Sequence, residues 1–223
     1  MTITALVAGI VFVAIGAGAE RLASVWPPDE ASGRSPGVRT ILMALAAGVV
    51  AAAIAWRSTL PTWALAVHLL ILAILVVLTA TDLEQRRLPH LLLDPLIVVA
   101  VVFVPFNPGV PWTDALIGAA VAVAFMGLLG LLVRGGVALG DLYLVGPIGL
   151  VVGWPAIFVA IFVAGLLSAV FSALLLVTRR AGLKTYIPFG PFLVAGMVVT
   201  LLRDAALLGP VAAALTSAAL PLN

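Results

Sequence analysis

The sequence predicts an all-α, polytopic bundle of transmembrane helices with about eight spans. Of the 223 residues, 64% are hydrophobic and only 9% are charged, and the mean hydropathy is +1.31. A soluble domain, by contrast, is about a quarter charged. Long apolar runs recur along the chain, each close to the roughly 20 residues that a helix needs to cross a bilayer. They lack the alternation of barrel strands. This composition excludes a soluble globular domain, a disordered chain and a nucleic-acid-binding protein.

Eight apolar segments are predicted to cross the membrane in turn. They are residues 3–18, 40–56, 62–81, 91–106, 114–133, 141–153, 155–177 and 188–203. The sixth segment is short and contains Gly146, Pro147 and Gly149, which predicts a bent or broken helix. A further apolar stretch, 205–220, is either a ninth crossing or a helix lying in the interface. Too little polar sequence remains for a second domain, so we predict one membrane domain over 1–223.

The basic residues predict the orientation of the chain. If the N-terminus lies outside, nine of the eleven Lys and Arg residues fall in inside loops, and only Arg57 and Arg203 lie outside. The cytoplasmic loops are then 19–39, 82–90, 134–140 and 178–187. The first of these is rich in Pro, Gly and Ser, which predicts irregular structure. It is too short to form a domain with its own core.

Two aspartates stand at predicted membrane boundaries on the same, cytoplasmic face. Asp82 ends the third span and Asp141 opens the sixth. Two carboxylates at one depth can supply the protonated acid and the ionised base of an aspartyl hydrolase. The alternative is structural: Asp82 as a solvated residue where a helix leaves the membrane, and Asp141 as an N-cap.

A third feature lies on that face, where residues 187–192 read Ile-Pro-Phe-Gly-Pro-Phe. Pro188, Phe189, Gly190 and Pro191 open the eighth span, which is either a simple helix start or a stretch of unpaired backbone that binds an extended peptide. Glu84 follows Asp82 closely and Asp94 lies about a turn into the fourth span, so both are candidates for the same cleft. His90 and Asp94 are four apart, but two residues do not make a metal site. His68 is too far along its helix from Asp82 and is predicted to be a packed, hydrogen-bonded side chain.

These segments together resemble the type IV prepilin peptidase family, the GxGD-type intramembrane aspartyl proteases. The matching stretches are Asp82-Leu83-Glu84 with Leu88-Pro89-His90, then Gly140-Asp141-Leu142, then Pro188 to Phe192. The resemblance covers about residues 62–203 and implies a six-span peptidase core there. Two N-terminal spans over 1–61 precede this core, and a C-terminal apolar segment, 204–223, follows it. It also implies that Asp82 and Asp141 are catalytic, and that Gly140, Glu84, Asp94 and residues 188–191 contact the substrate.

The sequence departs from the family pattern at three places. Ala138 replaces the first glycine of GxGD, and Tyr143 stands where lysine is frequent. Many bacterial members carry an insert after the first helix, with zinc-binding cysteine pairs and an N-methyltransferase activity. Here that place holds the loop 19–39, and the chain contains no cysteine. We therefore expect no metal, no cofactor and no methyltransferase activity.

The resemblance implies an aspartic endopeptidase that removes the leader peptide of type IV prepilins or pilin-like pseudopilins. The protein would be a multi-pass protein of the bacterial inner membrane, in contact with lipid, with its active site on the cytoplasmic side. Two alternatives remain open at this point: a catalytically silent member that only binds pilin-like proteins, and a small proton-coupled transporter. Polar residues are sparse at the predicted bilayer midplane apart from His68, which favours the protease over the transporter.

Overall fold

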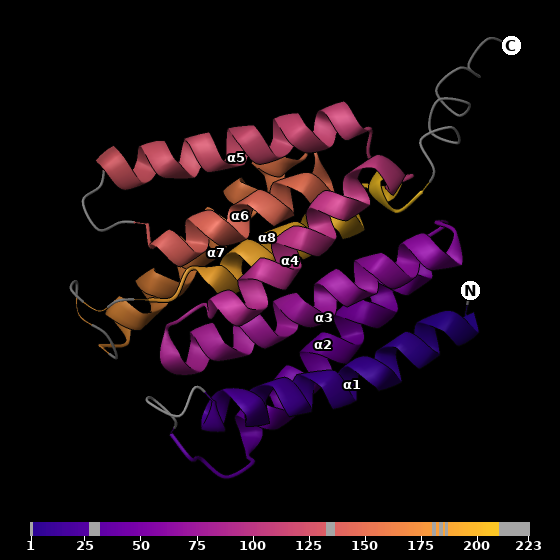
Figure 1. Cartoon of the computed structure of the whole chain (residues 1–223). Coiled ribbons are helices and arrows are strands. Elements are labelled where there is room, and N and C mark those ends of the chain that lie inside the picture. The colour runs from indigo at the N-terminus through magenta and orange to yellow at the C-terminus, as the bar shows by residue number, and fades with distance from the viewer. Residues whose placement is uncertain are drawn as a thin grey trace, which may run out of the picture.

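The chain folds as a bundle of α-helices, as the sequence predicts (Figure 1). The computed structural model describes residues 2–26, 32–132, 137–179, 182, 185 and 187–209. Those residues form eight α-helices and two short 3₁₀ helices, and they contain no strand. The elements are α1 (Thr2–Val25), α2 (Val38–Arg57), α3 (Thr62–Gln85), α4 (His90–Phe103), η2 (Val104–Phe106), α5 (Trp112–Leu132), α6 (Leu139–Val152), α7 (Ile157–Val177), α8 (Gly190–Arg203) and η3 (Ala205–Leu208).

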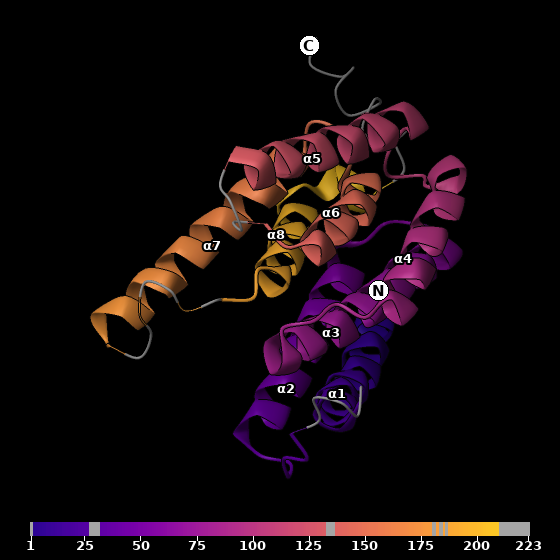
Figure 2. The same ribbon diagram turned by 60° about the vertical axis from the view of Figure 1, so that its left-hand side comes forward.

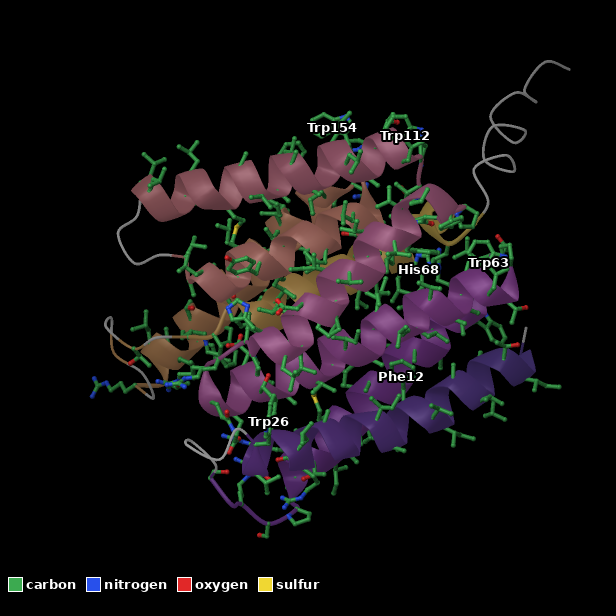
Figure 3. The ribbon with its side chains drawn as sticks, viewed as in Figure 1. Phe12, Trp26, Trp63, His68, Trp112 and Trp154 are labelled. Atoms are coloured by element: carbon green, nitrogen blue, oxygen red, sulfur yellow. The ribbon has the colours of Figure 1, made fainter. Side chains whose placement is uncertain are left out.

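Five of these helices are long and apolar enough to cross a bilayer, by length and composition: α1, α2, α3, α5 and α7. The other three apolar segments are shorter, namely α4 with η2, α6 and α8. Tryptophans mark both ends of the bundle: Trp63 and Trp112 lie toward one end and Trp26 toward the other (Figure 3). This placement is typical of residues at the two membrane interfaces.

The predicted spans agree with the observed helices within a few residues, with two corrections. Helix α1 continues to Val25, so the irregular part of the predicted loop 19–39 begins only after it. Polar side chains that leave the hydrocarbon do not end a helix, since its backbone stays paired in water as well. The sixth span is not broken, because α6 continues from Leu139 to Val152 with Pro147 inside it. The stretch 205–220 begins with η3, and its remainder from residue 210 lies outside the described residues.

Helix α3 is the central element of the bundle. Helix α1 packs along α2 and α3, α5 packs along α6, and α7 packs along α8, while α3 also contacts α4 and α8. Just over half of the apolar stretch of α3 is buried inside the bundle, compared with 17% of the apolar stretch of α7. Small residues allow close contact, as at Gly196 of α8, where an added Cβ would clash with the carbonyl oxygen of Ala160 in α7.

Successive helices run in opposite directions, so their connections alternate between two ends of the bundle. The C-terminal ends of α1, α3, α5 and α7 and the starts of the helices that follow them lie at one end, which is on the left in Figure 1. The N-terminus and the α2–α3 and α4–α5 connections lie at the other end. His68 of α3 is buried, and its Nδ1 lies 2.9 Å from the carbonyl oxygen of Ala64. This confirms a packed, hydrogen-bonded histidine.

The arrangement predicts how reporters fused to each connection behave. Fusions after residues 26, 87 and 138 should report one side and fusions after residues 59 and 109 the opposite side; the excess of basic residues predicts that the first side is the cytoplasm. Paired alkaline phosphatase and green fluorescent protein fusions measure this, because each reporter is active on one side only. A periplasmic signal from the connection after residue 87 or the one before residue 138 would contradict the shared end.

Candidate functional site

Asp82 is held in the protein interior near the end of α3. The helix continues for three residues beyond it, and the Asp82 carbonyl oxygen accepts the N–H of Arg86, which caps the helix in a left-handed conformation. Only 3% of Asp82 is exposed. The structural alternative, in which Asp82 is a solvated residue where the helix leaves the membrane, therefore does not match this buried environment. A carboxylate in such a place needs polar partners or a second titratable group.

Asp141 lies in the first turn of α6 and is equally buried, with 3% exposed. The N-cap of this helix is Ala138, so Asp141 is not the cap that the structural alternative assumed. Its backbone N–H donates to the carbonyl oxygen of Ala138 at 3.1 Å. Asp82 and Asp141 lie close enough for their carboxylates to interact electrostatically. The fold thus brings together two buried acidic side chains that are 59 positions apart in the sequence.

The start of α8 completes this group. The backbone N–H of Gly190 donates to Oδ2 of Asp82 at 3.1 Å, a contact between residues 108 positions apart. An added Cβ on Gly190 would lie 2.6 Å from that oxygen and 3.6 Å from Leu144 of α6. Phe189 is the N-cap of α8 and Pro191 lies in its first turn. A glycine at this point therefore allows α8 to begin directly against the Asp82 carboxylate.

The beginnings of α4 and α6 pack together beside the aspartates. A Cβ on Gly140 would meet Leu88, just before α4, at 3.1–3.2 Å. The ring of His90 meets the ring of Tyr143 edge to face, with centroids 5.3 Å apart. Nδ1 of His90 lies 3.6 Å from Oδ1 of Asp94, whose side chain is 69% exposed. Asp94 thus presents an accessible carboxylate at this end of the bundle.

Glu84 lies on another side of α3. Its carboxylate pairs with Arg34 at 2.9 Å and with Arg39 at 3.4 Å, and its side chain is 9% exposed. Arg34 also pairs with Glu20 at 2.6 Å, and Thr40 donates to the other Glu20 oxygen at 2.7 Å. The hydrogen bond to Glu20 raises the pKa of the Arg34 guanidinium further above its ordinary value. The structure therefore places Glu84 in an ion-pair network with the α1–α2 connection.

Sequence reasoning missed this connection between the N-terminal helices and α3. The side-chain amide of Gln85 donates to the carbonyl oxygens of Ala23 and Trp26, at 2.7 and 3.0 Å. Together with Arg34, it ties the end of α1 to the end of α3. The signal in the sequence was Glu20, an acidic residue next to a long apolar segment. A carboxylate in that position needs a basic partner.

The buried carboxylates could perform acid–base chemistry at the edge of the membrane. Two adjacent carboxyl groups that share one proton offer a general acid and a general base within one site. Among the described residues no group of three or more His, Cys, Asp or Glu side chains could hold a metal ion. Of the residues predicted for the site, Asp82, Asp141 and Gly190 lie together, Gly140 and Asp94 lie at the neighbouring α4–α6 contact, and Glu84 points away.

Known proteins match most of the chain. Residues 69–173 match the type IV leader peptidase family. The chain is 33% identical to a prepilin leader peptidase/N-methyltransferase of Aeromonas salmonicida (strain A449) over 182 residues, which are 78% of this chain and 60% of that protein. Identity to the Pseudomonas aeruginosa protein of the same description is 30% over 75% of this chain and 60% of the relative. Identity to the Bacillus subtilis (strain 168) protein of the same description is 28%, over 59% of this chain and 53% of the relative.

The chain therefore spans at most 60% of the length of these curated relatives. No solved structure matches it.

The contact between Gly190 and Asp82 predicts the effect of a single methyl group. In Gly190→Ala the Asp82 side chain must turn away, and it loses the hydrogen bond from the residue-190 N–H. We expect the free energy of unfolding to fall by about 1 kcal/mol, measured by denaturant titration in mild detergent. Gly18→Ala in α1 is the control, because a Cβ there meets no atom within 4 Å. Equal stability of the Gly190→Ala variant and wild type would contradict the contact.

Proposed function

Because the chain belongs to the type IV leader peptidase family, we propose that it is an aspartic endopeptidase that removes the leader of prepilins or pilin-like pseudopilins. The observation that carries the proposal is the buried pair Asp82 and Asp141, brought together from α3 and α6. Family membership supports a peptidase that processes prepilins, and the two carboxylates supply the chemistry for it. The activity needs no metal or organic cofactor in this proposal.

In the proposed mechanism Asp82 and Asp141 share one proton, because two adjacent like charges cannot easily coexist. The ionised carboxylate takes a proton from a water molecule, and the water oxygen attacks the scissile carbonyl carbon. The protonated carboxyl group stabilises the developing oxyanion and supplies a proton. As the C–N bond breaks, the leaving amine takes the proton that was removed from water, and one hydroxyl of the tetrahedral intermediate returns its proton to the other carboxylate, so the pair is again singly protonated. The N–H of Gly190 holds one Asp82 oxygen during these steps.

The two departures from the family motif are compatible with this proposal. Ala138 has φ −77° and ψ 148°, an extended conformation that any residue adopts. The glycine that the family motif has at this position is therefore not required by the backbone. Tyr143 packs on His90 and connects α6 with α4. These contacts support a site that is assembled, which favours an active peptidase over a silent pilin-binding member.

We propose that residues 188–191 bind the substrate backbone as it leaves the membrane. Gly190 of this segment donates its N–H to Asp82, so a peptide along the segment would lie next to the carboxylate pair. Asp94 is exposed and would attract the basic leader. Glu84 remains a proposed leader contact as well, although its carboxylate is already engaged by Arg34 and Arg39. Gly140 would contribute by keeping the start of α6 close to Leu88.

We place the protein in the bacterial inner membrane with the aspartates at the cytoplasmic face. The support for the face is the excess of basic residues in the connections at the Asp82 end. The support for a multi-pass membrane protein is the set of apolar helices, five of which have spanning length. Prepilins would reach the site from the membrane plane, with the leader in the cytoplasm and the following apolar segment in the bilayer.

The aspartyl mechanism predicts that each carboxylate is separately required. Asp82→Asn and Asp141→Asn keep the side-chain shape but cannot ionise, so each should reduce cleavage by on the order of a thousandfold or more. The double variant should be hardly worse than either single one, since members of a catalytic unit are non-additive. A gel-shift cleavage assay on a pilin-like substrate, with membrane levels matched by immunoblot, measures this.

Asp114→Asn is the matched control, because Asp114 lies in the first turn of α5, at the opposite end of the bundle. It should cleave at the wild-type rate. Substantial processing by Asp82→Asn or Asp141→Asn would overturn the aspartyl mechanism. A wild-type protein that binds pilin-like substrates without cleaving them would instead support the silent member.

We further propose that the chain does not methylate the new N-terminus of its product. The connection between α1 and α2 covers only residues 26–37 and the chain has no cysteine, so the zinc-binding insert of longer family members has no counterpart here. Mass spectrometry of the product made with this protein alone should show the unmethylated mass. An added methyl group, about 14 Da, would show that the proposal is wrong.

A further inference from the structure

Helices α5 and α7 border a long apolar groove on the side of the bundle. Helix α5 packs mainly on α6 and α7 mainly on α8, which leaves a lateral face between α5 and α7. Figure 2 shows the C-terminal part of α7 extending away from the other helices. Two cavities of about 470 and 430 Å³ lie on this face. Both are lined by Phe125, Ile161 and Phe162, so they form one continuous groove.

The two ends of the groove are defined by the two ends of α8. One cavity reaches Arg203, the last residue of α8, and the other reaches Phe189, its N-cap. The 14 residues of α8 correspond to about 21 Å of helix. This length exceeds the half-thickness of about 15 Å that one lipid leaflet contributes to the hydrocarbon core. The groove therefore follows a helix that is longer than one leaflet is thick.

One end of the groove meets the candidate site. Phe189 lines the groove, and the next residue, Gly190, donates its N–H to Asp82. Between Phe189 and Arg203 the lining is uncharged. An occupant of the groove must therefore be apolar along its length, and its end nearest Phe189 comes close to the aspartate pair.

The wall on the α7 side is shaped for close approach of a helix. Gly165 and Ala169 are four positions apart and both line the groove. A Cβ on Gly165 would meet no atom within 4 Å, so its surface is open. Small residues with this spacing let a second helix backbone approach closely inside a membrane. Phe125 and Phe162 border the same groove with large side chains that are partly exposed.

We propose that this groove is the docking site for the apolar transmembrane helix of the substrate. The inference rests on the proposed peptidase function and adds to it the path by which substrate reaches the aspartates. A helix seated between α5 and α7 would have its cytoplasmic end at Phe189, so the peptide bond just before the helix lies beside Asp82 and Asp141. The uncharged lining accepts the helix and leaves the basic leader outside it. The continuity with the site and the length of the groove favour a spanning helix over a lipid chain.

The absence of cysteine from the chain permits a direct test by disulfide cross-linking. Gly165→Cys and Ala169→Cys are made in the Asp82→Asn background, which retains uncleaved substrate. Val170→Cys is the matched control, because Val170 is next to Ala169, is 59% exposed and does not line the groove. The probe is a pilin-like protein with one cysteine placed at successive positions of its apolar helix, oxidised with copper phenanthroline in membranes.

We expect adducts at Gly165→Cys and Ala169→Cys about tenfold above Val170→Cys, since a disulfide requires Cβ atoms within about 4.5 Å. The reactive substrate positions should recur with helical spacing. Equal adduct formation at the Val170→Cys control would overturn the proposed docking site. Disulfides between two copies of this chain, in place of substrate adducts, would also overturn it. So would no adduct at any position, which is the result expected if lipid fills the groove.

Cleavage by the cysteine-free wild type is measured in parallel, so that the two proposals fail separately. Groove-specific adducts without any wild-type cleavage retain the docking site and overturn the peptidase proposal. Cleavage together with adducts that do not prefer the groove retains the peptidase and overturns the docking site. As a second readout, Gly165→Trp should raise KM about tenfold by filling the groove, whereas Val170→Trp should leave KM unchanged, because only buried apolar contact contributes to binding.

Discussion

The hydrocarbon interior of a bilayer offers no hydrogen-bonding partner to a peptide group, and this constraint organises the whole molecule. Every described segment long enough to enter the membrane is a helix, and the connections between helices collect at two ends. Charged side chains follow the same rule. Asp82, Asp141, Glu20 and Glu84 are all near helix ends, where partners from other helices or from water are within reach.

The buried acidic residues at the Asp82 end of the bundle have two different kinds of partner. Glu20 and Glu84 are neutralised by Arg34 of the α1–α2 connection, and Glu84 also by Arg39 in the first turn of α2. Asp82 has no such counter-ion among its described contacts: it accepts a backbone N–H from Gly190 and lies within electrostatic range of a second carboxylate. The first arrangement stabilises structure, while the second leaves two acids whose protonation can change during a reaction. The contrast separates the residues that hold the bundle together from those that are candidates for chemistry.

Much of the fold follows from hydropathy alone, because a spanning helix is a local feature that about 20 consecutive residues determine. The ends of α2 and α8 were predicted within two residues of their observed bounds. The common end of Asp82 and Asp141 follows from counting the crossings between them. The contact of Gly190 with Asp82 and the pairing of Glu84 with Arg34 could not be predicted in this way. Each joins residues from distant helices, and which faces of those helices meet is decided by side-chain packing rather than by sequence periodicity.

The Arg34 bridge between Glu20 and Glu84 has a consequence for how freely this region can be rearranged. A segment between two transmembrane helices is ordinarily a convenient place for insertion, because its backbone is exposed and its ends are tolerant. Here the same segment supplies the counter-ion of two side chains that are mostly buried. Replacing it with a longer module would leave Glu20 without its arginine and Glu84 with Arg39 alone, unless the new module brought its own cation to the same point. The connection is short, yet it cannot be exchanged without changing the ion pairs of α1 and α3.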